Sequence, residues 1–130
     1  MEPLYINASP TSPEIDFRFA QHTLSIKGES YPENAAAFYG PVIHSLRDYL
    51  AQCEADTEIT VHVSLAYFNS SSTKMLFTLF EALNDAALAG KRVCLNWYHD
   101  EDDDTILEFG QELQDDFGAL DFIDHPVCSN

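Results

Sequence analysis

The fold is decided by residues 58–74, which read EITVHVSLAYFNSSSTK. In the first part of this stretch apolar side chains alternate with polar ones, and one face receives Ile59, Val61, Val63 and Leu65. Such alternation predicts a β-strand over residues 58–67, and its apolar, aromatic end is typical of a central strand. Residues 69–73 then supply Asn, Ser and Thr side chains, which cap helix N-termini. The stretch therefore predicts a central strand followed directly by a helix.

Toward the N-terminus the pattern predicts short strands and one helix. Strand-like pieces at residues 4–7 and 15–19 flank a loop rich in Pro and Ser. Residues 23–27 alternate again and Gly28 follows as a turn, which predicts a β-hairpin. At Ser30 a helix start is expected, because its hydroxyl can accept from the backbone N–H of Glu33. This helix runs to about Gln52, and its apolar face consists of Phe38, Val42, Leu46, Tyr49 and Leu50.

Toward the C-terminus strands and helices continue to alternate. The helix after residue 73 points Met75, Leu76, Leu79, Phe80, Leu83 and Ala87 inward, and Gly90 closes it. A strand over residues 93–97, an acidic loop over 99–104, a helix over 106–117 and a strand over 120–123 follow. The expected order is ββαβαβαβ. It predicts an α/β fold: a mainly parallel β-sheet with an N-terminal hairpin and helices packed on it.

Composition limits the possible partners. The 130 residues fit one domain, residues 1–130, with 1–14 partly loop. With 22 acidic and 6 basic side chains the formal charge is −16, so nucleic acid and anionic membrane surfaces are not expected partners. We expect any charged partner surface to be basic. No run of residues is apolar and long enough to cross a bilayer, and residues 1–3 show neither the positive region nor the apolar region of a leader, so a cytoplasmic location is expected.

Familiar catalytic and metal-binding motifs are missing from the sequence. The three cysteines are far apart, the five histidines lack metal-ligand spacing, and the acidic run 100–104 fails the EF-hand pattern. No G-x-S-x-G or glycine-rich phosphate loop occurs. We therefore expect no catalytic residue, no metal and no cofactor. A small hydrolase or transferase that pairs Ser70 with a distant histidine stays open as an alternative, because such groups converge only in space.

The hydroxyl cluster at residues 70–73 is the unusual feature. One Ser would suffice to cap a helix, whereas this turn carries three Ser and a Thr. A phosphate placed here would meet helix N–H groups and the positive end of the helix dipole, with Lys74 one turn from Ser70. The cluster therefore favours a phosphorylation site.

The residues also carry a family resemblance. The strand followed by a Ser-rich turn and a helix is similar to the STAS domains of anti-sigma factor antagonists, in which an Asp-Ser-Ser-Gly turn holds the phosphorylated serine. Three segments, residues 28–34, 67–74 and 95–98, more closely resemble the SiaC-type biofilm-regulating phosphoproteins. The resemblance covers roughly residues 15 to 125 and implies a STAS-like fold.

This resemblance implies a non-enzymatic bacterial switch in c-di-GMP signalling. A Ser/Thr protein kinase modifies the protein, a PP2C-type phosphatase reverses the modification, and the unmodified form activates a GGDEF-type diguanylate cyclase. The modified hydroxyl follows the turn Asn69, which makes it Ser70, with Ser71, Ser72 and Thr73 as alternatives. Family members can carry Thr at this position. An anti-sigma factor antagonist in a partner-switching pathway is the alternative function.

The partner-binding surface is expected around the same turn. The loops after successive parallel strands gather at one edge of a sheet, so we expect residues 30–34 to adjoin the Ser70 turn. The residues assigned to partner binding are Ser30, Tyr31, Pro32, Glu33, Asn34, Phe68, Asn69, Ser71 and Lys74.

Overall fold

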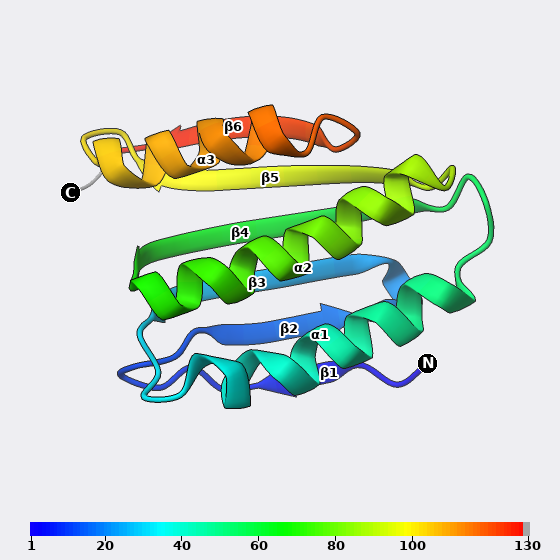
Figure 1. Ribbon diagram of the computed structural model, residues 1–130, viewed down its shortest axis with the longest axis horizontal. Coiled ribbons are helices and arrows are strands. Elements are labelled where there is room, and N and C mark those ends of the chain that lie inside the picture. The colour runs from blue at the N-terminus through cyan, green and yellow to red at the C-terminus, as the bar shows by residue number, and fades with distance from the viewer. Residues whose placement is uncertain (129–130) are drawn as a thin grey trace.

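The computed structural model describes residues 1–128, so the last two residues of the expected range 1–130 lie outside the described part. It contains a six-stranded sheet and three α-helices (Figure 1). In chain order the elements are β1 (Leu4–Ile6), β2 (Glu14–Arg18), a 3₁₀ turn (Phe19–Gln21), β3 (Thr23–Ser30), α1 (Ala35–Gln52), β4 (Glu58–Phe68), α2 (Ser70–Leu88), β5 (Arg92–Asp100), α3 (Asp104–Asp116) and β6 (Asp121–Val127). Within this described part no helix is long and apolar enough to cross a membrane.

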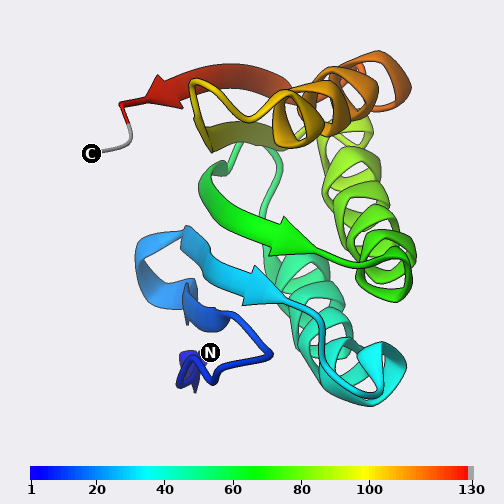
Figure 2. The same cartoon turned by 90° about the vertical axis from the view of Figure 1, so that its left-hand side faces the viewer.

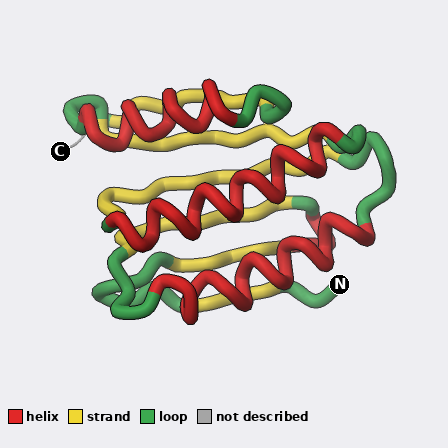
Figure 3. Tube along the Cα trace, viewed as in Figure 1, coloured by secondary structure: helices red, strands yellow, loops and turns green. Residues whose placement is uncertain are grey.

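The strands lie side by side in the order of the chain, β1 to β6. The first three pair antiparallel, and β3 to β6 pair parallel. Each helix connects one parallel strand to its neighbour, always in the same direction along the sheet, so right-handed crossovers place all three helices on one face. Figure 3 shows the three helices in front of the strands, and Figure 2, turned by 90°, shows that they all lie on one side of the sheet. The expected fold class is confirmed.

Alternation along the strands explains which face is buried. In β4, Ile59, Val61 and Val63 are buried under the helices, whereas His62 and Ser64 lie on the open face and are only partly buried. The apolar faces of α1 and α2 cover the sheet, and Leu46, Leu76, Leu79 and Leu83 are fully buried there. A continuous core therefore lies between the helices and one face of the sheet.

The N-terminal part differs from the sequence-based expectation in three ways. Three strands, not two, precede the first helix. Gly28 is not a turn: it lies inside β3 with φ +128, at a register shift where Glu29 pairs with Tyr67 of β4. Ser30 does not cap α1, because it ends β3 opposite Phe68, and Asn34 caps the helix by accepting from the N–H of Ala37 at 3.0 Å. Pairing with β4 outweighed the local turn and capping signals.

At the C-terminal side, β5 is longer than expected. His99 belongs to β5 rather than to the acidic loop, because it pairs with Pro126 of β6. The end of the acidic run caps a helix, as its sequence suggests: Asp103 Oδ1 accepts from the N–H of Ile106 at 3.1 Å. Parallel pairing also extends β6 to Val127.

Candidate functional site

Two helix N-termini meet at the edge of the sheet where β3 and β4 end. Ser30 is the last residue of β3, and Phe68 is the last residue of β4. The two chain segments that follow are joined directly, because the N–H of Asn69 donates to the carbonyl of Ser30 at 3.0 Å. The structure thus brings residues 30–34 and the Ser70 turn together, as the parallel topology predicts.

The four hydroxyls of residues 70–73 occupy different environments. Ser70 is the first residue of α2, and both Ser70 and Ser71 are exposed. Ser72 is fully buried, and Thr73 is partly buried with its hydroxyl donating to the carbonyl of Asn69 at 3.1 Å. In this conformation Ser70 and Ser71 are accessible to solvent, whereas the Ser72 hydroxyl is enclosed.

A groove separates the two helix N-termini. It has a volume of about 690 Å³ and is lined by Glu33, Asn34, Ala35, Ala36, Ser71, Lys74 and Met75. Neither α1 nor α2 carries an acidic side chain in its first turn, unlike α3, which carries Asp104. The positive ends of two helix dipoles therefore lie beside an exposed Lys74 in a protein of charge −16.

Two exposed tyrosines lie near the ends of β3 and β4. Tyr31 and Tyr67 are 37% and 50% exposed, and their rings meet edge to face with centroids 5.7 Å apart. Phe68 points inward instead: its ring packs against that of Phe109 in α3, with the ring centroids 4.6 Å apart. Pro32 is partly buried. Of the residues assigned to partner binding, Tyr31, Glu33, Asn34, Ser71 and Lys74 are exposed, whereas Ser30 and Phe68 face the interior.

Beneath this edge lies a buried set of hydroxyls that the sequence analysis did not recognise. We call Ser30, Tyr39 and Ser72 the hydroxyl triad; all three residues are fully buried. The Ser30 hydroxyl lies 2.5 Å from the Tyr39 hydroxyl and donates to Ser72 Oγ at 2.8 Å. Burial raises the pKa of Tyr39 to about 12, although the hydrogen bond with Ser30 opposes the shift. The spacing in the sequence placed Phe38 on the apolar face of α1. In the structure Phe38 is partly buried, and the next residue, Tyr39, is fully buried.

The hydrolase alternative requires an imidazole beside Ser70. Each histidine of the described chain has a different partner: His22 Nδ1 contacts the Tyr49 hydroxyl at 2.5 Å, and His62 Nδ1 contacts that of Tyr98 at 3.0 Å. The remaining contacts are His44 with Asp48, His99 with Asp124 and His125 with Asn96. Within residues 1–128 no imidazole hydrogen-bonds to the hydroxyls at 70–73, so the required nucleophile and base do not meet.

In the same range no group of three His, Cys, Asp or Glu side chains could hold a metal ion.

Comparison with known proteins places the chain in a family. A family model described as SiaC family regulatory phosphoprotein matches residues 6–127. The chain belongs to the SiaC family. An uncharacterized protein of Pseudomonas aeruginosa, strain UCBPP-PA14, is 30% identical to it over 116 residues, which are 89% of this chain and 90% of that protein.

Solved SiaC structures share the same fold. Apo-SiaC from Pseudomonas aeruginosa is 28% identical, with a TM-score of 0.87 over 96% of this chain and 99% of that chain. A chain in the structure of the diguanylate cyclase SiaD in complex with its activator SiaC, from the same bacterium, is 27% identical. It also has a TM-score of 0.87, over 95% of this chain and 99% of that chain. SiaC of that bacterium is thus the activator of SiaD.

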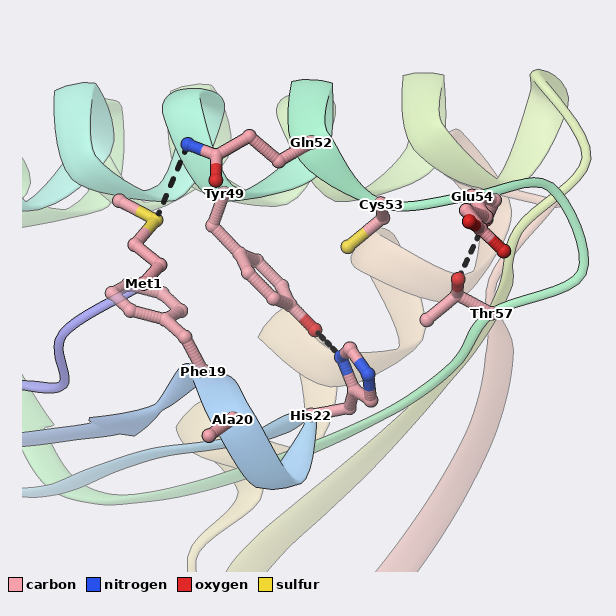
Figure 4. Close-up of a pocket in the computed structure, with 9 residues that line it drawn as sticks. All are labelled: Met1, Phe19, Ala20, His22, Tyr49, Gln52, Cys53, Glu54 and Thr57. Atoms are coloured by element: carbon pink, nitrogen blue, oxygen red, sulfur yellow. Dashed lines mark hydrogen bonds between the residues drawn. The ribbon is translucent and has the colours of Figure 1, made fainter.

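This SiaC-family chain has a second cavity far from the Ser70 turn, near the C-terminal end of α1 (Figure 4). It has a volume of about 360 Å³, and its lining includes Phe19, His22, Tyr49 and Cys53. The rings of Phe19 and Tyr49 stack with centroids 4.7 Å apart, and the Tyr49 hydroxyl contacts His22. None of the residues assigned from the sequence lines this cavity.

Proposed function

We propose that this chain is a non-enzymatic regulator that binds and activates a diguanylate cyclase when Ser70 is unmodified. A Ser/Thr protein kinase modifies Ser70, and a PP2C-type phosphatase restores the hydroxyl. The observation that carries this proposal is the position of Ser70: an exposed hydroxyl at the start of α2, beside a groove between two helix N-termini. Membership of the SiaC family and the complex of SiaC with SiaD support it.

The proposed binding surface consists of the groove, the exposed face of the first turns of α2, and the Tyr31–Tyr67 pair. Exposed tyrosines supply contact area at a low cost in side-chain entropy, and interfaces are enriched in them. The chain as a whole carries a charge of −16, so basic residues elsewhere on the partner favour the encounter, whereas the Tyr31–Tyr67 pair supplies the contact area at this edge.

Modification acts through local electrostatics. A phosphate adds about −1.5 to −2 charges at pH 7, and the N-terminus of α2 with Lys74 favours such a charge in the free protein. In a complex, the same charge must leave water. Desolvation of an unpaired charge costs several kcal/mol, so the modified form releases the cyclase without unfolding.

Variants of Ser70 test this mechanism. We expect Ser70→Asp to melt within a few degrees of the native protein but to bind its diguanylate cyclase about 100-fold more weakly, which equals about 2.7 kcal/mol. Ser70→Ala is expected to bind normally and to accept no phosphate from the kinase. Calorimetric titration with the diguanylate cyclase from the bacterium that produces this chain measures binding. A kinase assay measures phosphate incorporation.

Ser71→Ala is the matched control, because Ser71 is the other exposed hydroxyl of the turn. It is expected to accept phosphate from the kinase like the native protein, which makes it a control for the position of the acceptor. Tight binding by Ser70→Asp would contradict the switch. Phosphate incorporation into Ser70→Ala, but not into Ser71→Ala, would move the acceptor to Ser71.

A further inference from the structure

The hydroxyl triad joins three elements at the candidate site. Ser30 ends β3, Tyr39 lies in the second turn of α1, and Ser72 lies in the first turn of α2. A buried hydroxyl without a partner costs about 1 to 3 kcal/mol, whereas apolar side chains would fill the same space without that risk. A fully bonded polar network in a core fixes one arrangement of the elements that it joins.

Backbone groups extend the triad into a closed ring. Ser30 Oγ donates to Ser72 Oγ at 2.8 Å, the N–H of Ser72 donates to Asn69 Oδ1 at 2.9 Å, and the N–H of Asn69 donates to the Ser30 carbonyl at 3.0 Å. We call this closed path the Ser30–Asn69–Ser72 ring. Ser70 and Ser71 are the residues between its Asn69 and Ser72 members, and Tyr31 directly follows Ser30.

We propose that the hydroxyl triad couples Ser70 to residues 31–37, so that modification of Ser70 changes both walls of the groove together. This inference rests on the proposed function, in which Ser70 is the modified residue. Ser30, Tyr39 and Ser72 are positioning residues: they hold the two helix N-termini in the arrangement that the partner binds.

The coupling follows from competition for one donor. A phosphate on the first residue of a helix accepts from the free N–H groups of the first turn. In this chain the N–H of Ser72 is already bonded to Asn69 Oδ1. A phosphate that takes this N–H draws Ser72 away from Asn69, and the hydrogen bond between the Ser30 and Ser72 hydroxyls passes the change to Ser30 and to the segment after it. Tyr39 carries the same change into the second turn of α1 through the Ser30 hydroxyl.

Hydrogen exchange on protein with phosphoserine installed at position 70 tests the coupling without a kinase. Codon suppression during synthesis supplies this form. In the native background we expect the modification to change exchange rates about fivefold or more in residues 69–75 and also in residues 31–37, as expected for hydrogen bonds of ordinary strength. In Ser72→Ala and in Tyr39→Phe, residues 69–75 still respond, whereas the response of residues 31–37 falls to less than twofold.

Tyr49→Phe is the matched control. Tyr49 lies on the same helix as Tyr39, is also buried and also uses its hydroxyl, but at the opposite end, where it contacts His22 (Figure 4). Loss of the Tyr49 hydroxyl is expected to leave unchanged the hydrogen-exchange response of residues 31–37 to modification of Ser70. A general loss of stability would change all three variants alike, whereas the coupling distinguishes Tyr39→Phe from Tyr49→Phe. If one variant does not fold, Ser30→Ala removes the central hydroxyl of the triad and replaces it in the test.

Two results would overturn the coupling: residues 31–37 that do not respond in the native protein, or a response that survives in Ser72→Ala or in Tyr39→Phe. Failure of the proposed function gives a different pattern. In that case the exchange response occurs as described, but cyclase binding does not depend on modification of Ser70. The two measurements therefore separate a wrong function from a wrong coupling.

Discussion

At the residue scale, Ser30 shows how one side chain can satisfy a local signal and still serve another purpose. Its spacing to Glu33 matches a capping box, but the structure uses Ser30 to end β3 and to bond Tyr39 and Ser72. Asn34, four residues later, caps α1 instead. Both residues are good caps, and only the pairing of β3 with β4, about 40 residues away in the sequence, decides between them.

Tyr39 gives a prediction about alkaline pH. Its pKa is about 12 in the folded protein, because burial disfavours the anion, against 10.0 in the unfolded chain. Above pH 10 the unfolded chain loses this proton and the folded protein keeps it. The contribution to the free energy of unfolding is therefore complete below pH 10 and is lost as the pH rises toward 12.

The native protein and Tyr39→Phe can be compared by urea unfolding at pH 9 and pH 11. We expect the stability advantage of the native protein over the variant to shrink by about 1.4 kcal/mol between these two pH values. Burial also raises the pKa of Tyr49, and this effect cancels in the comparison because Tyr49 is present in both proteins. An advantage that stays constant would mean that Tyr39 ionises as in the unfolded chain.

At the element scale, α3 approaches the sheet through a glycine. A Cβ at Gly110 would lie 2.6 Å from both Cδ1 and Nε1 of Trp97 and 3.2 Å from Cζ of Phe122. Trp97 is fully buried and fixed, because its Nε1 donates to the carbonyl of Ile106 at 3.0 Å and its ring stacks on Phe109. The tryptophan therefore cannot move away from an added methyl group at low cost.

Gly110→Ala is expected to lower the free energy of unfolding by about 1 to 3 kcal/mol, the usual cost of overpacking a core. Gly118→Ala is the control, because Gly118 is exposed in the turn after α3 and a Cβ there meets nothing within 4 Å. Its effect should stay within about 0.5 kcal/mol, as for other surface substitutions. Thermal or urea unfolding measures both variants, and equal stability of the two would show that α3 shifts to accept the methyl group.

Element by element, the sequence predicted what depends on local pattern. Alternation placed β4 and β5, the 3.6-residue period placed the helices, and the Asn-Ser-Ser turn placed the start of α2. It failed where pairing with a distant strand decides, as at Gly28, Ser30 and His99. For the site, spacing found both segments that line the groove, whereas the burial of Ser72 and its bond to Ser30 depend on where the tertiary fold places the start of α2 relative to the end of β3.

At the scale of the whole molecule, one sheet with its helices on a single face must remain folded under a charge of −16. Six basic side chains cannot neutralise 22 acidic ones. In the described chain two arginines form ion pairs, Arg18 with Asp16 and Arg92 with Glu58, and both arginines are exposed, although Asp16 is partly buried. Exposed pairs contribute little to stability. Repulsion between carboxylates therefore opposes the compact state over most of the surface.

This repulsion predicts that salt stabilises the fold. The screening length falls from about 10 Å at 0.1 M to about 3 Å at 1 M ionic strength, so added NaCl weakens repulsion between separated surface charges. We expect the Tm to rise by about 3 °C or more between 0.1 and 1 M NaCl, which corresponds to roughly 1 kcal/mol for a protein of this size. Glu101→Lys is the control, because Glu101 is exposed within the acidic run 100–104 and the change removes one negative charge and adds one positive charge. This variant should melt at a higher temperature than the native protein at 0.1 M and should gain less from salt. Scanning calorimetry measures both proteins, and a salt-dependent rise that is equal in the two would assign the effect to stronger apolar burial rather than to charge, since apolar burial is the same in both.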